Sequence, residues 1–118
     1  MKRKLTIVAV AALLAPGAAM AEEEACKIAV LQADGMATIT GLAHGAQWNS
    51  GRYSMSVTVQ NGTNRSVSRQ GGTIASDADG AATLARSVVS LPPGSEAEIV
   101  LELRNGAAET RCFSRLAG

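Results

Sequence analysis

Histidine, serine and aspartate are the side chains of this sequence that could support catalysis or bind a metal, but their spacing favours neither. His44 is the only histidine, and no cysteine or second histidine lies at the local spacing that a zinc site requires. No serine stands in a Gly-x-Ser-x-Gly elbow, and a lone histidine without an orienting partner argues against a catalytic triad. The sequence therefore predicts that the protein is not an enzyme.

The run Asp77-Ala78-Asp79-Gly80 is similar to the first positions of a calcium-binding loop. In such loops a later position carries a glutamate that binds the ion through both carboxylate oxygens, and here that position is Val88. We therefore interpret the run as a turn. We expect neither a metal ion nor another cofactor in this protein.

Three arginines are the side chains best suited to contact a partner. Arg65 and Arg69 are separated by two full periods of a strand, so both should lie on one face of it, and Arg52 precedes them on a neighbouring segment. Arginine forms charge-assisted hydrogen bonds to carboxylates and carbonyls. Arg52, Arg65 and Arg69 are therefore candidate binding residues, although a merely soluble, solvent-facing surface would have the same composition.

The N-terminus has the pattern of a secretory signal peptide over residues 1–21. A cationic head precedes an apolar run that Pro16-Gly17 ends, and Ala19-Met20-Ala21 provides the small residues of a cleavage site. The apolar run is about ten residues long, half of the ~20 that a membrane span needs. Cleavage would leave 8 basic against 10 acidic residues, so the formal net charge would change from +1 to −2. This balance argues against nucleic acid as a partner.

Cys26 and Cys112, the two cysteines, could form a disulfide, a metal pair or a redox couple. They are far apart in the sequence, and neither a CxxC nor a CxC spacing is present. Isolated pairs in secreted chains usually form structural disulfides, which we predict here. Closing a loop of about 87 residues would stabilise the fold by about 4.5 kcal/mol on the chain-entropy model.

Apolar and polar residues alternate along the segment that leads to the arginines. Tyr53, Met55, Val57 and Val59 occupy one parity, and serine, threonine and glutamine occupy the other. This period of two predicts a strand with one buried face. Asn61-Gly62 then predicts a hairpin turn into a second strand, which we expect to end before Gly71-Gly72.

Turn signals divide the rest of the chain into similar short strands. Asp34-Gly35 and Asn105-Gly106 predict hairpin turns, and Pro92-Pro93-Gly94 predicts a break. No helix is expected after the signal peptide. The seven predicted strands are 26–32, 36–43, 52–60, 63–70, 81–91 (alternatively a bent pair), 96–104 and 109–113.

Seven short strands with no other element predict one all-β domain over residues 22–118. We expect an immunoglobulin-like antiparallel β-sandwich of about seven strands, with the single disulfide joining the first and last strands. The hallmarks of antibody domains are missing. Trp48 lies in a loop between strands, and the cysteines lie at the two ends of the domain.

Segments over nearly the whole domain carry a family resemblance: Cys26-Lys27-Ile28, Ser50-Gly51-Arg52-Tyr53, Ser68-Arg69-Gln70-Gly71-Gly72, Leu91-Pro92-Pro93-Gly94 and the final Cys112. In this order and spacing they resemble the CsgH family of curli assembly proteins. The resemblance implies a periplasmic immunoglobulin-like sandwich, related to the enterobacterial curli protein CsgC, that keeps curli subunits from forming amyloid before secretion. The CxC redox pair associated with the CsgC group is absent, so no thiol-exchange role is expected.

The resemblance also implies a partner and a mode of action. The client would be an amyloid-forming curli subunit, bound transiently through polar and arginine-bearing strand surfaces. Serine, threonine and arginine on such strands would also act as gatekeepers that keep the protein from becoming an amyloid template itself. We expect a monomer that does not insert into the membrane after signal cleavage.

Two alternatives remain at this point. The same sandwich hosts many functions, so a secreted binding module or a small protease inhibitor would have a similar sequence. A curli subunit itself is not favoured, because the chain has no internal repeat of roughly 20 residues.

Overall fold

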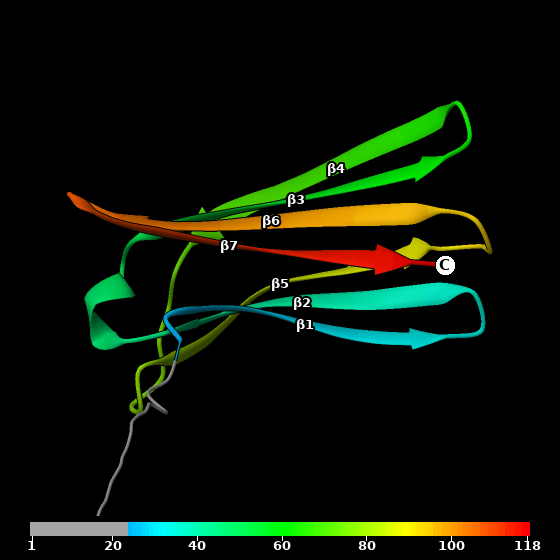
Figure 1. The fold of residues 1–118 in the computed structure, drawn as a ribbon. Helices are drawn as coiled ribbons and strands as arrows, with labels where there is room; N and C mark the ends of the chain where they lie inside the picture. Colours follow the sequence, from blue (N-terminus) through cyan, green and yellow to red (C-terminus); the bar gives the residue numbers. More distant parts are fainter. Residues whose placement is uncertain (1–23) are drawn as a thin grey trace, which may run out of the picture.

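The computed structural model describes residues 24–118, so the predicted signal peptide lies outside the described residues. Within them the chain forms seven strands and one short 3-10 helix (Figure 1). The elements are β1 (Cys26–Ala33), β2 (Met36–His44), η3 (Ala46–Trp48), β3 (Arg52–Asn61), β4 (Asn64–Thr73), β5 (Ala81–Ser90), β6 (Glu96–Asn105) and β7 (Ala108–Ala117).

The strands form two antiparallel sheets packed as a sandwich. One sheet has three strands in the order β1-β2-β5, and the other has four in the order β4-β3-β6-β7. Figure 1 shows the two sheets as separate layers, with the crossings from β2 to β3 and from β4 to β5 at one end of the molecule. The structure therefore confirms the predicted all-β, immunoglobulin-like sandwich.

The alternation seen in the sequence decides which side chains enter the core. Met55 and Val57 of β3 are buried, and the register places Met55 opposite Leu101 of β6, which is fully buried. Ile39 of β2 covers these residues from the other sheet as part of one core cluster. The sheets approach closely at Gly41, where an added Cβ would lie 3.2 Å from atoms of Leu101 and Met55.

The cysteines are joined as predicted. The Cys26–Cys112 disulfide connects β1 of the three-stranded sheet to β7 of the four-stranded sheet, with the two Cα atoms 5.8 Å apart. Cys26 is buried in the core, and Cys112 lies opposite Leu101 of β6. The bond therefore fastens one side of the sandwich from sheet to sheet.

The structure corrects two predicted strand ends. β4 continues through Gly71 and Gly72 to Thr73, because both glycines remain paired with β3. Gly72 lies against the ring of Tyr53, where a Cβ would be 3.3 Å from a ring carbon, so the missing side chain leaves room for the aromatic ring. β7 extends to Ala117 rather than ending at 113.

The segment that contains Trp48 also differs from the prediction. Residues 46–48 form the 3-10 helix η3 where only a loop was expected, and Trp48 is 4% exposed. The turn is anchored to the four-stranded sheet, because the side-chain amide of Asn105 donates to the carbonyl oxygens of Gln47 and Asn49. The aromatic ring therefore closes one end of the core.

The segment predicted at 81–91 forms one strand, β5 (Ala81–Ser90), and not a bent pair. Its pairing with β2 shifts by one residue between Gly41 and Leu42, which is a bulge in the ladder. The first hairpin turn is as predicted: Asp34 and Gly35 have φ angles of 56° and 75°, the two positive values that an Asp-Gly hairpin turn needs.

Candidate functional site

The three candidate arginines lie on the outer face of the four-stranded sheet. Arg65 and Arg69 of β4 are paired with Gln60 and Ser56 of β3, residues whose parity is opposite to that of the core side chains. Arg52 begins β3 with the same outward parity, and all three arginines are exposed. The structure thus places all three on one face, as the spacing predicted for Arg65 and Arg69.

They do not form one cluster. Arg69 lies four positions along β4 from Arg65, and its register partner Ser56 lies four positions along β3 from Arg52. At about 3.3 Å per residue, neighbouring arginines are therefore about 13 Å apart along the sheet. Arg65 and Arg69 share the edge strand β4, whereas Arg52 lies at the far end of β3 beside Arg104 of β6.

Arginines on the opposite margin of this face are paired with glutamates. Arg111 contacts Glu102, and Arg115 contacts Glu98 with 3.3 Å between Nη2 and Oε2. Both pairs cross from β7 to β6 and are largely exposed, so each contributes little to stability. These are the ion pairs found in residues 24–118, and neither includes Arg65 or Arg69. The positive charge of β4 is therefore not compensated by a contacting carboxylate.

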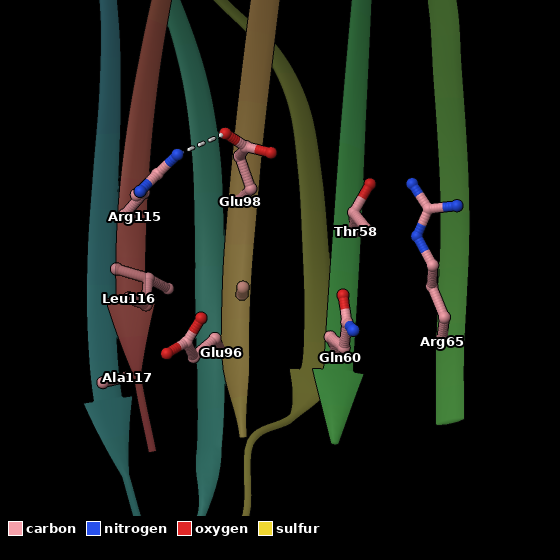
Figure 2. Close-up of a pocket in the computed structure, with 9 residues that line it drawn as sticks. Thr58, Gln60, Arg65, Glu96, Glu98, Arg115, Leu116 and Ala117 are labelled. Atoms are coloured by element: carbon pink, nitrogen blue, oxygen red, sulfur yellow. Dashed lines mark hydrogen bonds and ion pairs between the residues drawn. The ribbon is translucent and has the colours of Figure 1, made fainter. Parts of the chain in front are cut away.

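A shallow groove lies on the same face at the end of the sheet. Figure 2 shows Arg65 on one side of it, Thr58 and Gln60 in the middle, and the Glu98–Arg115 pair on the other side. Its volume is about 400 Å³. The lining carries both charge signs and several hydrogen-bonding side chains, which suits contact with a polar segment of polypeptide.

The acidic side of this groove was not among the candidate binding residues predicted from the sequence. Glu96 and Glu98 belong to β6, and they reach the groove because β6 lies between β3 and β7. Their alternation with Ala97 and Ile99 showed that they face outward. That alternation carries no information on which strands flank β6.

The edges of the two sheets differ in how well they are covered. β1 and β7 are joined by the disulfide, and Nε2 of Gln32 donates to the carbonyl oxygen of Ala117 at 3.1 Å. On the other side, Nε2 of Gln70 donates to the carbonyl oxygen of Arg86 in β5, also at 3.1 Å. Side chains therefore cover part of three of the four edge strands.

The fourth edge strand, β4, is open. Its residues are exposed except Gln70 and Gly72, which are half-buried. Figure 1 shows the β3–β4 hairpin diverging from the three-stranded sheet toward its turn. Within residues 24–118 no side chain makes a hydrogen bond to the main chain of β4. A strand with free main-chain groups can pair with another chain.

The Asp77–Gly80 run has a structural role in the described chain, and His44 takes part in main-chain pairing. Oδ1 of Asp77 accepts hydrogen bonds from the backbone N–H groups of Asp79 and Ala81, at 2.8 and 3.0 Å, so this run is the turn that we predicted. The backbone N–H of His44 donates to the carbonyl oxygen of Ala25 at 2.9 Å. No group of three or more potential metal ligands converges in residues 24–118.

Residues 24–118 contain little helix, which is the short 3-10 helix η3. Among residues 24–118, no helix has the length and apolar character that crossing a membrane requires.

Comparison with known proteins identifies the family. The family described as CsgH protein matches residues 25–115 of the chain. The chain belongs to the CsgH family. No curated protein matches the sequence significantly.

Two solved structures share the fold. The solution structure of R. palustris CsgH is 18% identical, with a TM-score of 0.60 over 75% of this chain and 87% of that one. The E. coli curli protein CsgC is 17% identical, with a TM-score of 0.62 over 76% of this chain and 94% of that one. At these identities the likeness establishes the fold, and membership in the curli-related CsgH family supports a curli-related role.

Proposed function

We propose that this protein is a periplasmic, chaperone-like inhibitor of curli amyloid formation. It binds curli subunits transiently through the polar, arginine-bearing surface of β3 and β4 and so prevents premature fibril formation. The observation that carries the proposal is the CsgH family match over residues 25–115. The uncompensated charges of Arg65 and Arg69 beside an open strand edge support it.

The physics of amyloid growth explains why such a surface would be effective. A fibril grows when a subunit adds a strand to unpaired main-chain groups, and any flat edge strand presents the same groups. A protein with an open edge strand can therefore pair with an unfolded subunit through the same main-chain groups that a fibril end uses. The arginines steer the encounter with carboxylates more than they strengthen the final complex, which suits transient binding.

The action needs no bond cleavage and no cofactor. Inhibition would come from occupying subunits, nuclei or fibril ends, with Arg52, Arg65 and Arg69 as the client-binding residues. Because amyloid growth amplifies from rare nuclei, an inhibitor of nuclei or ends acts well below one molecule per subunit.

The cellular location belongs to the same proposal. Residues 1–21 would be removed as a signal peptide, and the domain over residues 22–118 would act in the periplasm as a monomer. An intact mass that begins at Glu22, measured on protein from a periplasmic extract, would support this. Uncleaved protein in the cytoplasmic fraction would contradict it.

A thioflavin time course with a purified curli major subunit tests the function. We expect the mature protein to lengthen the lag or slow elongation at ratios well below one to one. Bovine serum albumin at the same concentration is the control for nonspecific adsorption. If equimolar protein leaves both the lag and the elongation rate unchanged, the curli assignment should be replaced by a general binding module.

A protease panel separates the remaining alternative. A small protease inhibitor blocks its target at one molecule per enzyme, whereas an amyloid inhibitor leaves proteases active. Stoichiometric inhibition of a protease, together with normal fibril growth, would favour the alternative.

A further inference from the structure

The hairpin geometry fixes which main-chain groups of β4 are free. Asn61 of β3 pairs with Asn64 of β4 across a loop of two residues. In such a hairpin the closing pair exchanges both of its hydrogen bonds, and hydrogen-bonded and non-hydrogen-bonded pairs then alternate along the ladder. The even-numbered residues of β4 therefore bond to β3. The N–H and C=O groups of the odd-numbered residues Arg65, Val67 and Arg69 point to the free edge.

The same odd-numbered residues direct their side chains to the outer face. Val67 pairs with the outward residue Thr58 and is 45% exposed, between Arg65 and Arg69 along the strand. The edge thus presents an uninterrupted row of free main-chain groups together with an arginine–valine–arginine series of side chains. A single added strand can therefore contact both the free main-chain groups of β4 and its outer-face side chains.

We propose that a strand of the curli subunit adds to the free edge of β4 and continues the four-stranded sheet. Main-chain hydrogen bonds to Arg65, Val67 and Arg69 would supply affinity, as in other cases of strand addition. This inference rests on the proposed function and names the binding mode at the same surface.

The side chains of β4 define the chemistry of the segment that fits. In an added strand, the outer-face positions opposite Arg65, Val67 and Arg69 are spaced as i, i+2 and i+4. Directly opposed side chains interact, and opposite charges or paired apolar groups stabilise the sheet. The preferred segment therefore carries acidic residues at i and i+4 and an apolar residue at i+2.

A second copy of this chain is a poor occupant of the edge. Antiparallel pairing of two β4 strands centred on Val67 would place Arg65 of each copy opposite Arg69 of the other. Like charges directly opposite each other destabilise a sheet. The arginines thus disfavour pairing of β4 with a second copy and favour pairing with an acidic strand. Charged residues have this effect on many edge strands.

Val67→Pro tests the mode of binding by removing one free N–H. Because this N–H is not part of the β3–β4 ladder and proline is tolerated on edge strands, the fold should persist. Val67→Thr is the matched control, since it keeps the N–H and the β-branched shape. In the thioflavin assay we expect Val67→Pro to need at least about tenfold more protein for the same delay, because a ladder hydrogen bond is lost and a client carbonyl is left unpaired. Val67→Thr should lose less activity than Val67→Pro, because it keeps the N–H and gives up only the apolar contact of the valine side chain.

The outcomes distinguish this inference from the function on which it rests. If the wild type delays fibril growth and folded Val67→Pro delays it equally, strand addition is wrong and the inhibitory function stands. If the wild type has no effect, the function itself fails. A dimer in sedimentation velocity that Val67→Pro abolishes would show that a second copy occupies the edge, and would overturn the proposal.

Amide hydrogen exchange tests the same contact in the wild-type protein and requires no variant to fold. Addition of monomeric curli major subunit during the lag phase should slow exchange of the amides of Arg65, Val67 and Arg69. The exposed amides of the β1–β2 turn at Asp34-Gly35 serve as the internal control. Unchanged exchange along β4, under conditions in which the wild type delays fibrils, would overturn the proposal.

Discussion

Arginine has two different environments on the outer face of the four-stranded sheet. Arg111 and Arg115 of β7 are paired with glutamates of β6, and their charge is locally balanced. Arg65 and Arg69 of β4 have no such partner in the described chain. An incoming carboxylate can therefore pair with the β4 arginines without first displacing another carboxylate, which makes them the residues to test first.

Charge reversal at these two positions should separate binding from stability. We predict that Arg65→Glu with Arg69→Glu keeps the thermal midpoint within a few degrees, because both side chains are exposed. The same double variant should need at least about tenfold more protein to delay fibril growth, since two charge-assisted contacts become repulsive. Circular dichroism melting and the thioflavin assay measure the two effects.

Lys27→Glu with Arg86→Glu is the matched control for this experiment. Both residues are exposed on the outer face of the three-stranded sheet, and their reversal changes the net charge by the same amount. We expect this control to inhibit like the wild type, and added salt to weaken the wild type. Full inhibition by the β4 variant at low salt would show that the arginines form only a soluble surface.

At the scale of elements, the four sheet edges are protected in different ways. A disulfide and a glutamine hydrogen bond cover the β1–β7 side, and Gln70 bonds to β5 from the other side. On β4 the two arginines disfavour pairing with a second copy of the strand, but they leave its main-chain N–H and C=O groups unpaired. The hairpin that carries the candidate site is therefore also the least covered part of the sandwich.

Amide exchange in the isolated protein should reveal this open edge. We predict that the amides of Arg65, Val67 and Arg69 exchange faster than those of Ser66, Ser68 and Gln70, because only the second set bonds to β3. Residue-resolved exchange followed by NMR measures the alternation. Equal protection of neighbouring residues along β4 would show that the edge is covered in solution.

At the scale of the whole molecule, one covalent bond joins the two sheets. The domain is small and buries a modest core, so a link between β1 and β7 has a large effect on its stability. The link lies on the side of the sandwich away from β4, because β7 and β4 are the opposite margins of one sheet. Stability and binding are therefore expected to be separable.

Removing the disulfide should reduce stability and spare activity. We predict that Cys26→Ser with Cys112→Ser lowers stability by about 2–5 kcal/mol, because the unfolded chain gains the entropy that the closed loop had removed. The thermal midpoint should fall by more than about 10 °C. Scanning calorimetry measures the loss, and fibril inhibition should persist at temperatures where the variant is folded.

Two results would contradict this prediction. A variant that melts like the wild type would show that the bond contributes nothing to stability. A variant that is folded but no longer inhibits would point to a redox role for the cysteine pair, which the absence of a CxC spacing argues against.

The amino-acid sequence determined the strands and their buried faces. The alternation from Tyr53 to Val59 predicted the inner face of β3, and Asn61-Gly62 predicted its turn, because a period of two and a tight turn are local properties. The disulfide followed from there being only two cysteines. The outward, exposed positions of Arg65 and Arg69 followed from their spacing.

Only the tertiary structure decided which strands are neighbours and which edge stays open. Arg115 meets Glu98 because β7 pairs with β6, and Gln70 covers Arg86 because β4 and β5 lie at adjacent edges of different sheets. The burial of Trp48 and the continuation of β4 through Gly72 likewise depend on contacts with β6 and with Tyr53. Such contacts join residues distant in the chain, so local alternation, which carries no information on strand order, could not predict them.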